Sequence, residues 1–197
     1  VKTDNTGTSN NDQFTIPTVA GNLYNVTTSD GQTLNGNTDD LTITFPSAGT
    51  YDVNISGDFR QIFFANGGDK SKLLDVKNWG NIVWTSMSSA FRGCVNIATF
   101  SATDAPNLSS VTNMSGIFWG ASSFNQPLDS WDVSNVTDMS NLVRSSPFNQ
   151  PLNSWDVSSV TDMSFMFTSS SFNQSLNSWN VSSVSNMQYI FYGSSFN

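Results

Sequence analysis

Short polar triplets recur in the last third of the chain and hold the side chains best suited to bind a ligand. Each triplet places Asp or Asn between two Ser residues, at every second position. The three copies are Ser130, Asp132 and Ser134; Ser154, Asp156 and Ser158; and Ser178, Asn180 and Ser182. Carboxylate, amide and hydroxyl oxygens bind hard cations such as Ca²⁺ and also form hydrogen bonds to proteins and glycans. These triplets are therefore the candidate ligand-binding residues.

The same triplets have a simpler interpretation as a solvated face whose small side chains bond one another. Stacked Asp residues repel each other modestly, and Asn180 relieves that repulsion in the third copy. We favour this interpretation over contact with a protein or glycan, and we place metal binding last. The sequence accordingly predicts no metal site.

Groups that could catalyse a reaction are scarce. The chain has no His, its 15 acidic residues are all Asp, and Cys94 is its one cysteine. A Cys nucleophile needs a basic partner, and Cys94 stands where a core residue is expected in the stretch SAFRGC. Paired carboxylates of glycosidases need a defined separation and one raised pKa, whereas these Asp residues repeat in exposed, turn-like contexts. The sequence predicts neither an enzyme nor a cofactor.

Charge and hydropathy narrow the range of partners. Seven Lys and Arg residues against 15 acidic ones give a net charge of -8 and a pI near 4.1. Nucleic acids and anionic membrane surfaces are bound by clustered basic residues, so neither is an expected partner. No apolar run reaches the length of about 18 residues that marks a transmembrane helix, so we expect no membrane insertion.

The triplets belong to a repeat of 24 residues that begins at Phe124, Phe148 and Phe172. A fixed period of this length is typical of a solenoid, in which each unit buries its apolar side against the next. The L-x-x-W-x-V stretch of each copy predicts a short strand that pairs in parallel with its neighbours, with the Trp side chain in the core. The later apolar residues, spaced by three, predict a turn of 3₁₀ or short α-helix.

The chain divides into three predicted segments. Residues 1–13 are polar and predict a flexible lead-in. Residues 14–57 alternate short apolar runs with turn signals, as at Leu41, Ile43 and Phe45, which predicts a small, sandwich-like antiparallel β domain capping the first coil. Residues 58–197 predict five or six coils. The expected fold class is mostly β, with a small N-terminal antiparallel β domain followed by a leucine-rich-repeat-like solenoid.

Other repeated or exposed residues have mainly structural interpretations. A column of Asn residues is expected to bond up and down the stack; it consists of Asn125, Asn149, Asn173 and Asn197. Asp138 and Asp162 are expected to bond the backbone of their own turns. The few exposed aromatic residues that could mark a binding face are Trp119, Tyr189 and Tyr192.

The repeat string FNQPLxSWDVSxVTDMSxMF closely resembles that of BspA-like leucine-rich-repeat surface proteins, a bacterial and mycoplasmal family of secreted or lipid-anchored adhesins. The stretches ITFPSAGTYDVNISGDF and NGGDKSKLLDVKNWG are similar to the β-sandwich-like leader that precedes these repeats in many members. The resemblance covers roughly residues 14–197. It implies a location at the cell surface and a role in adhesion or self-association, and it supplies no universal ligand.

Two functions follow as expectations. The first is a non-enzymatic extracellular surface protein that mediates adhesion or another protein–protein interaction, with a host or neighbouring-cell surface protein as partner. The alternative is a self-assembling subunit of an extracellular filament or surface layer, built as a head-to-tail homo-oligomer. Its docking edge would be the last coil, with an unpaired strand at Trp179–Val181. The candidate edge residues are Leu176, Trp179, Val181, Val184, Ile190 and Phe191.

Overall fold

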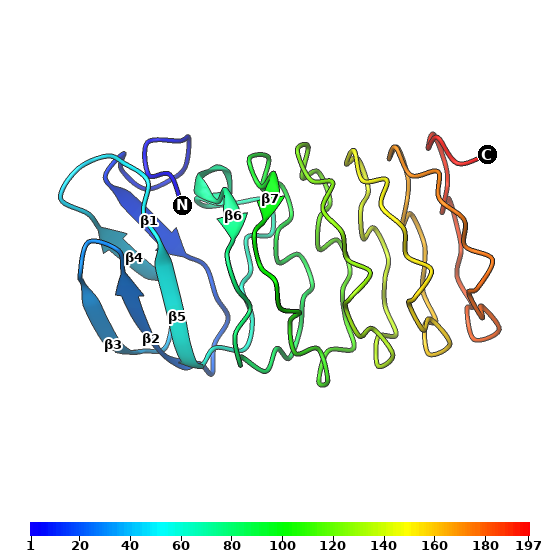
Figure 1. Cartoon of the computed structure of the whole chain (residues 1–197), viewed down its shortest axis with the longest axis horizontal. Coiled ribbons are helices and arrows are strands. Elements are labelled where there is room, and N and C mark those ends of the chain that lie inside the picture. The colour runs from blue at the N-terminus through cyan, green and yellow to red at the C-terminus, as the bar shows by residue number, and fades with distance from the viewer.

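Alternating apolar and polar residues in the first third of the chain form two small antiparallel sheets. In one, β1 (Gln13–Ile16) pairs with β4 (Leu41–Thr44), and the other has the order β3 (Thr33–Asn37), β2 (Leu23–Thr28), β5 (Val53–Asp58). The computed structural model describes residues 1–197 and has both sheets at one end of the molecule (Figure 1). Strand β3 occupies a stretch for which the sequence indicates only turns, and the other strands lie where alternation predicts them.

Side chains from both sheets contribute to the apolar core. Phe14 lies opposite Ile43 in the first sheet, and Val26 lies opposite Ile55 in the second. Phe14, Ile43 and Val26 are buried, and Ile55 is half-buried against them. Burial of alternate residues produces the period of two that the sequence displays.

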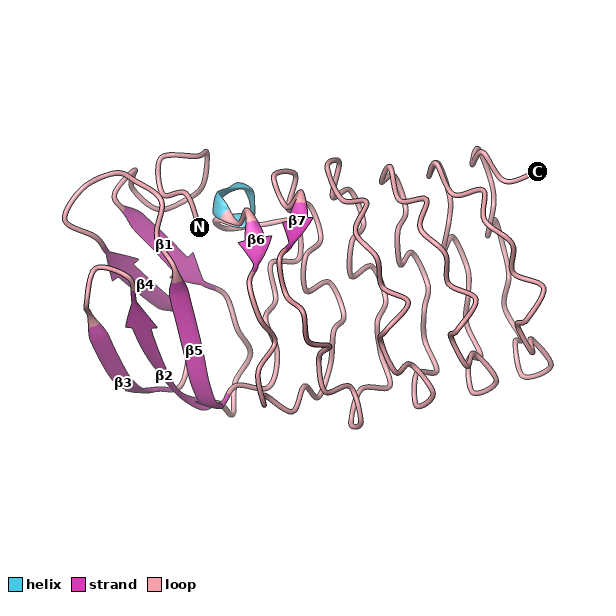
Figure 2. Cartoon of the chain, viewed as in Figure 1, coloured by secondary structure: helices cyan, strands magenta, loops and turns pink.

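Beyond β5 the chain winds into coils that lie side by side along the long axis of the molecule (Figure 2). The regular elements here are short: the 3₁₀ helix η1 (Lys70–Lys72) and the parallel pair β6 (Asp75–Val76) and β7 (Thr99–Phe100). Single parallel bridges join the later coils; they link Asn113, Asp138, Asp162 and Asn186 in succession. The prediction of a mostly β chain with little helix is confirmed.

Backbone hydrogen bonds between coils point in one direction in the segments that begin at Met87, Met114, Met139 and Met163. The N–H groups of Met139, Asn141, Val143 and Ser145 donate to the carbonyl oxygens of Asp162, Ser164, Met166 and Thr168, respectively, at 2.9 to 3.1 Å. The coils that contain Met87, Met114 and Met163 donate to the following coil with the same spacing of two residues. In this segment each coil therefore presents N–H groups to the next coil and carbonyl groups to the previous one, whereas the N–H groups of Thr137, Thr161 and Ser185 donate to the previous coil.

Each coil bends through turns that place one residue in the left-handed region. The Leu142 N–H donates to the Met139 carbonyl oxygen at 3.3 Å, and Asn141 between them has a φ of 57°. A positive φ at the third position of such a turn is typical of a type II turn, which favours Gly or Asn there. The residues at this position in successive coils are Ser89, Gly116, Asn141, Phe165 and Tyr189.

Two predictions about the coils are corrected. The segment after each Val forms these turns rather than a 3₁₀ or short α-helix, and the x-W-x-V stretch forms no strand. The Oδ1 atom of Asp132 accepts hydrogen bonds from the N–H and hydroxyl groups of Ser134, at 3.1 and 2.7 Å. Such a local bond competes with strand pairing, because it bends the backbone where a strand would have to stay extended. The coils pair through the segment around Asp138 instead.

Tryptophan and phenylalanine columns fill the space inside the coils. Trp131 and Trp155 are buried, as predicted, and the indole Nε1 of Trp155 donates to the Leu128 carbonyl oxygen of the preceding coil at 2.9 Å. Phe148 stacks on Phe124 with ring centroids 6.1 Å apart, and the same stacking continues along the column. Each coil thus buries its apolar side against its neighbours.

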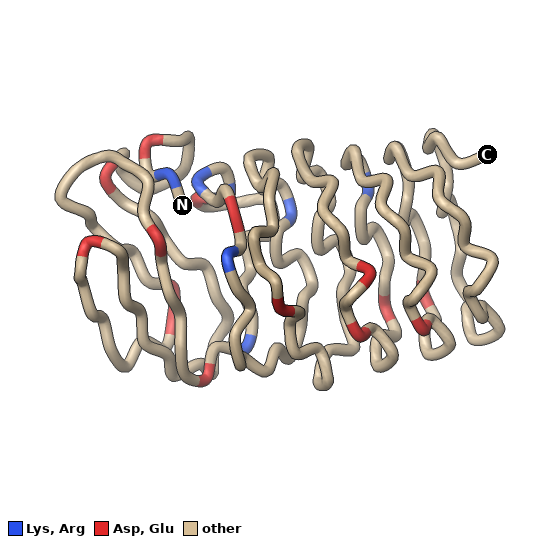
Figure 3. The backbone as a smooth tube through the Cα atoms, in the orientation of Figure 1, with Lys and Arg blue, Asp and Glu red and all other residues tan.

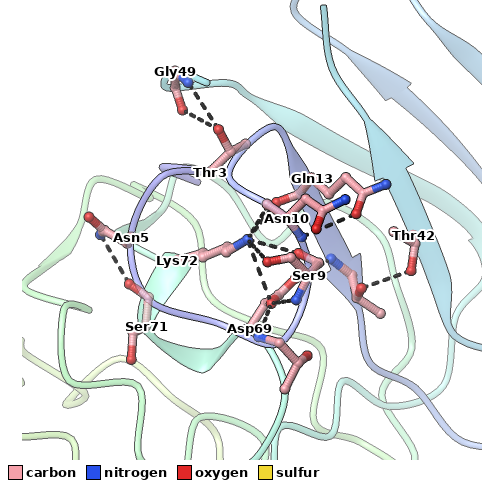
Figure 4. Close-up of polar contacts among 12 residues, drawn as sticks. Thr3, Asn5, Ser9, Asn10, Gln13, Thr42, Gly49, Asp69, Ser71 and Lys72 are labelled. Carbon is pink, nitrogen blue, oxygen red and sulfur yellow. Dashed lines mark hydrogen bonds and ion pairs between the residues drawn. The ribbon is translucent and has the colours of Figure 1, made fainter. Parts of the chain in front are cut away.

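Residues 1–13, for which the sequence predicts a flexible lead-in, are tied to the first coil. The side chains of Lys72 and Asp69 are fully buried where the first coil meets this segment (Figure 4). The Nζ atom of Lys72 donates to Ser9, Asn10 and Gln13, and the Asp69 carboxylate accepts from the backbone N–H groups of Thr8, Ser9 and Thr15. The structure differs from the prediction here because partners some 60 residues away hold the polar segment in place.

Candidate functional site

The predicted ligand-binding triplets come together on the outside of three successive coils. Every one of the nine residues is exposed or half-exposed. Asp156 and Asn180 repeat the turn of Asp132, since each accepts a hydrogen bond from the N–H of the Ser two positions later, at 3.0 and 3.2 Å. The Ser154 hydroxyl donates to Asp129 on the preceding coil. Some of the oxygens that a ligand would use, such as Asp132 Oδ1 and the Ser154 hydroxyl, therefore already have partners, and ligand binding by this face stays a prediction.

Electrostatics in the triplets favour charged, solvated carboxylates. Hydrogen bonds from the hydroxyl and N–H of Ser134 lower the pKa of Asp132, and those from Ser158 lower the pKa of Asp156 in the same way. No group of three or more Cys, Asp, Glu or His side chains is placed to hold a metal ion. This part of the surface consists of ionised turn residues.

A second polar column lies where the coils pair. Asp138 and Asp162 each accept the N–H of the Ser two positions later, at 2.9 and 2.7 Å, which confirms the predicted turn bonds. Asn113 donates to Asp138 and Asn186 donates to Asp162, both at 3.1 Å. Burial alone would raise the pKa of Asp162, but the bonds from Ser164 and Asn186 hold it below its usual value. An amide donor beside each carboxylate gives this column a structural role.

The Asn column is confirmed as a structural element. The Oδ1 atom of Asn125 accepts the N–H of Asn149 at 2.8 Å, Asn149 does the same for Asn173, and Asn173 does so for Asn197 at 3.0 Å. Each side chain thus replaces a backbone acceptor between coils.

Arginine and aromatic side chains form a strip across the coils that the sequence revealed only in part. The Arg92 guanidinium lies 3.7 Å from the centroid of the Trp119 ring, and the Arg144 guanidinium lies 4.7 Å from it. Arg144 is also 5.0 Å from the ring centroid of Phe165. We call the following residues the arginine–aromatic strip: Arg92, Trp119, Arg144, Phe165, Tyr189 and Tyr192.

The repeat itself aligns this strip. Arg92, Trp119, Arg144 and Tyr192 each lie five residues after a methionine of the repeat, namely Met87, Met114, Met139 and Met187. Phe165 and Tyr189 lie two residues after Met163 and Met187. Counting from the core methionines would have found Arg92, Arg144 and Phe165, which were not singled out from the sequence, whereas Trp119, Tyr189 and Tyr192 were.

Backbone conformation and exposure set the strip apart from the rest of the coils. Phe165 and Tyr189 both have a φ of 57°, a conformation that costs energy for bulky residues. Tyr189 is 51% and Tyr192 68% exposed, and Trp119 is half-buried between the arginines. The few Lys and Arg residues lie mostly in the N-terminal half of the molecule and near the first coils (Figure 3). Aromatic rings beside half-buried arginines combine two residue types that are enriched at protein interfaces.

The predicted self-association edge lies on the last coil, but its open groups differ from those predicted. Trp179–Val181 forms no strand. Val181 is 41% exposed, whereas Val157 one coil earlier is 1% exposed. The other edge residues are half-buried: Leu176, Trp179, Val184, Ile190 and Phe191. The unpaired donors are instead the backbone N–H groups of Met187, Tyr189, Phe191 and Gly193, which make no hydrogen bond.

The remaining singled-out group, Cys94, is a core residue. It is completely buried, and burial raises the pKa of its thiol. A thiol in this state is unreactive, because the thiolate is the nucleophile.

Comparisons with known proteins identify a family but no characterised relative. No helix of the structure has the length and apolar character needed to cross a membrane. No curated protein and no solved structure matches the chain. The profile of one family matches residues 85–197, more than half of the chain and most of its coils. The chain belongs to that family, which is described as Mycoplasma protein of unknown function, DUF285.

Proposed function

We propose that this chain is a non-enzymatic module of the cell surface that binds a protein through the arginine–aromatic strip. Aromatic residues and Arg are enriched at protein interfaces and supply most of the residues whose loss weakens binding strongly. The observation that carries the proposal is the pairing of Trp119 with two arginines, at 3.7 and 4.7 Å, on an otherwise acidic chain.

Strain in the strip supports a functional role. The positions of Phe165 and Tyr189 favour Gly or Asn, so a Phe and a Tyr there cost backbone energy that packing alone does not require. Residues held in unfavourable conformations cluster at binding and switch sites. An Asn at either position would relieve the strain, and the chain carries aromatic rings there instead.

The proposal includes a leucine-rich-repeat-like solenoid and an extracellular location. The 24-residue period and the hydrogen bonds between successive coils support the solenoid. The location rests on the resemblance of the repeats to BspA-like surface proteins. A rigid stack suits adhesion, because it holds the strip in one orientation across several coils.

Adhesion of the purified, fluorescently labelled chain to cultured animal cells tests this function. Trp119→Ser should lower saturable binding about tenfold or more if Trp119 is a central contact residue. The matched control is Ser130→Ala, an exposed residue of the triplet face, which should leave binding within about twofold. Phe165→Asn should weaken binding while the thermal midpoint stays the same or rises. Equal binding by all the variants, or no saturable binding by the original chain, contradicts the proposal.

A second candidate function is self-assembly, which the four open N–H groups of the last coil favour. Met187, Tyr189, Phe191 and Gly193 repeat the donor pattern by which the other coils bind their neighbours. An open edge of this kind pairs with any chain that offers matching acceptors. Sedimentation at several concentrations should then show head-to-tail oligomers, and Ile190→Lys should abolish them. A monomer at every concentration contradicts this candidate.

A further inference from the structure

A largely apolar cavity of about 500 Å³ lies between β5 and the first coil. Strand β5 contributes Val53 and Ile55 to its lining, and the coil contributes Val76, Trp79 and Ile82. Figure 1 shows β5 and β6 facing each other across this part of the molecule, with the N-terminus at one end of the gap. The volume lies within the range of about 300–1,000 Å³ that is usual for ligand sites.

Residues 1–3 already occupy one end of this gap as a single strand. The Tyr51 N–H donates to the Val1 carbonyl oxygen at 2.9 Å, and the Val1 nitrogen donates to the Tyr51 carbonyl oxygen at 2.8 Å. On the opposite side the Lys2 N–H donates to the Lys72 carbonyl oxygen at 2.8 Å. The gap is therefore one strand wide at this end.

The cavity continues in line with the space that residues 1–3 occupy. Lys2 lies beside both Thr50 and Lys72, and the cavity is lined by the residues that follow each of them in the chain. Both walls thus run from Lys2 along the cavity. A strand that entered in line with residues 1–3 would be antiparallel to β5, because Lys2 pairs with Thr50 in that sense.

The β5 wall of the cavity is an open strand edge. In an antiparallel ladder the peptide groups of successive residues point alternately to opposite sides. Tyr51 bonds Val1 on the side of the cavity. Asp52 bonds Ser29 on the side of β2, through its carbonyl oxygen and its N–H, each at 3.1 Å. Alternation therefore turns the peptide groups of Val53 and Ile55 toward the cavity, and neither makes a hydrogen bond to any segment outside the β2–β5 pair.

We propose that this slot is a binding site for an extended peptide strand, which adds antiparallel to β5 and pairs with Val53 and Ile55. Addition of a strand to an open sheet edge is a common mode of peptide recognition, in which the backbone gives affinity and alternate side chains give specificity. This site is separate from the arginine–aromatic strip, and its test is independent of the proposed function.

The lining defines the peptide that fits. The peptide residues opposite Val53 and Ile55 have their side chains on the same side of the sheet as those two residues. They therefore face the apolar cavity and should be Val or Ile. The residues between them face outward and should be small and polar. At the rim, Lys77 bonds Asp52 at 2.6 Å, and both side chains are well exposed. An exposed ion pair contributes about 0–1 kcal/mol, so it opens at little cost as the strand enters.

An extension of the chain provides the sharpest test, because linkage raises the effective concentration of the strand to about the millimolar range. The sequence Ser-Val-Thr-Val-Thr is placed before Val1; because Val1 pairs with Tyr51, this puts its two Val residues opposite Val53 and Ile55. The control extension has Pro in place of both Val residues and cannot donate the pairing hydrogen bonds. We expect the first extension to raise the thermal midpoint by several degrees and to slow amide exchange at Val53 and Ile55. We expect neither effect from the control.

Two further measurements complete the test. Val53→Pro removes the N–H that faces the slot; Pro is tolerated at strand edges, so this variant should fold but gain nothing from the extension. The acetylated and amidated pentapeptide should shift the Val53 and Ile55 amide resonances of the original chain in a saturable way, and not those of the extended chain, whose slot is filled. An equal rise in midpoint with the Pro control, or no added protection, overturns the proposal. Saturable binding of decanoic acid in the cavity without any effect of the peptide would assign it to a small apolar ligand instead.

Discussion

The Nζ atom of Lys72 lies 3.8 Å from a carboxylate oxygen of Asp69, and neither side chain is exposed to solvent. Charges are costly to bury, and this pair is retained because surrounding groups complete its hydrogen bonds. Gly7 belongs to the arrangement, since a Cβ atom at this position would lie 2.3 Å from Asp69 Oδ1. The pair holds the first 15 residues against the first coil.

Removing one partner of this pair should destabilise the chain strongly. Asp69→Asn leaves the Lys72 ammonium buried without a counter-charge, which costs about 3–5 kcal/mol of unfolding free energy. The matched control is Asp4→Asn, which breaks the exposed pair with Lys2 and should cost less than about 1 kcal/mol. Urea denaturation of the two variants measures both values. Equal, small losses would show that the buried pair does not anchor the segment.

Acid should weaken the fold through the same carboxylate. Burial alone would raise the pKa of Asp69, but the hydrogen bonds from Ser9 and Thr15 and the charge of Lys72 hold it below its usual value. A group with a lowered folded pKa stabilises above its unfolded pKa, near 3.9 for Asp, and loses that contribution as the pH falls through the folded pKa. The urea midpoint should be level from about pH 7 to 5 and fall below about pH 4. The fall should be shallower for Asp69→Asn, and a midpoint that rises in acid would contradict this account.

Two buried tryptophans should respond differently to the same substitution. Trp155 Nε1 donates to Leu128, whereas Trp84 Nε1 is buried with no hydrogen-bond partner. Trp155→Phe removes this hydrogen bond and leaves the Leu128 carbonyl oxygen with the Trp131 N–H alone, which adds about 0.5–1.5 kcal/mol to the cost of the lost ring volume. Trp84→Phe removes an unsatisfied donor, so it should cost less by about that amount. Thermal unfolding of both variants compares them, and an equal loss would mean that Trp84 has a partner in solution.

Metal should leave the stability of the chain unchanged. One carboxylate oxygen of Asp132 is already bonded by Ser134, and both oxygens of Asp162 are bonded, by Ser164 and Asn186. A ligand that binds only the folded state raises its apparent stability by mass action. The thermal midpoint should therefore agree in EDTA and in millimolar Ca²⁺. A rise of several degrees with Ca²⁺ would reassign these carboxylates as ligands.

The periodicity of apolar residues in the sequence predicts which side chains are buried. Alternation located β4 around Ile43, and the 24-residue repeat placed Trp131 and Trp155 in the core, because both features follow from which side chains must leave water. Turn chemistry was harder to predict. Gly116 signals a left-handed turn, but Phe165 occupies the same position one repeat later, so only the coil stack, and no local preference, shows its conformation.

Long-range polar contacts were beyond the reach of sequence patterns. Nothing near Ser9 indicates that Lys72 will bond it, since the two residues meet only when the first coil closes on the sheets. The sequence indicated only part of the arginine–aromatic strip. Trp119 was singled out because it is an aromatic residue, whereas Arg92 and Arg144 are recognised only by their common sequence spacing from the core methionines.

The shared direction of the bonds between the methionine segments of successive coils gives this side of the stack an electrical polarity. Peptide dipoles that point the same way add, as they do in a helix, so within these segments the carbonyl side is the negative pole and the N–H side is the positive one. The N–H groups of Met187, Tyr189, Phe191 and Gly193 lie at the positive end of this column of bonds. Two copies therefore cannot join by pairing these segments of their last coils with each other, because donors would face donors.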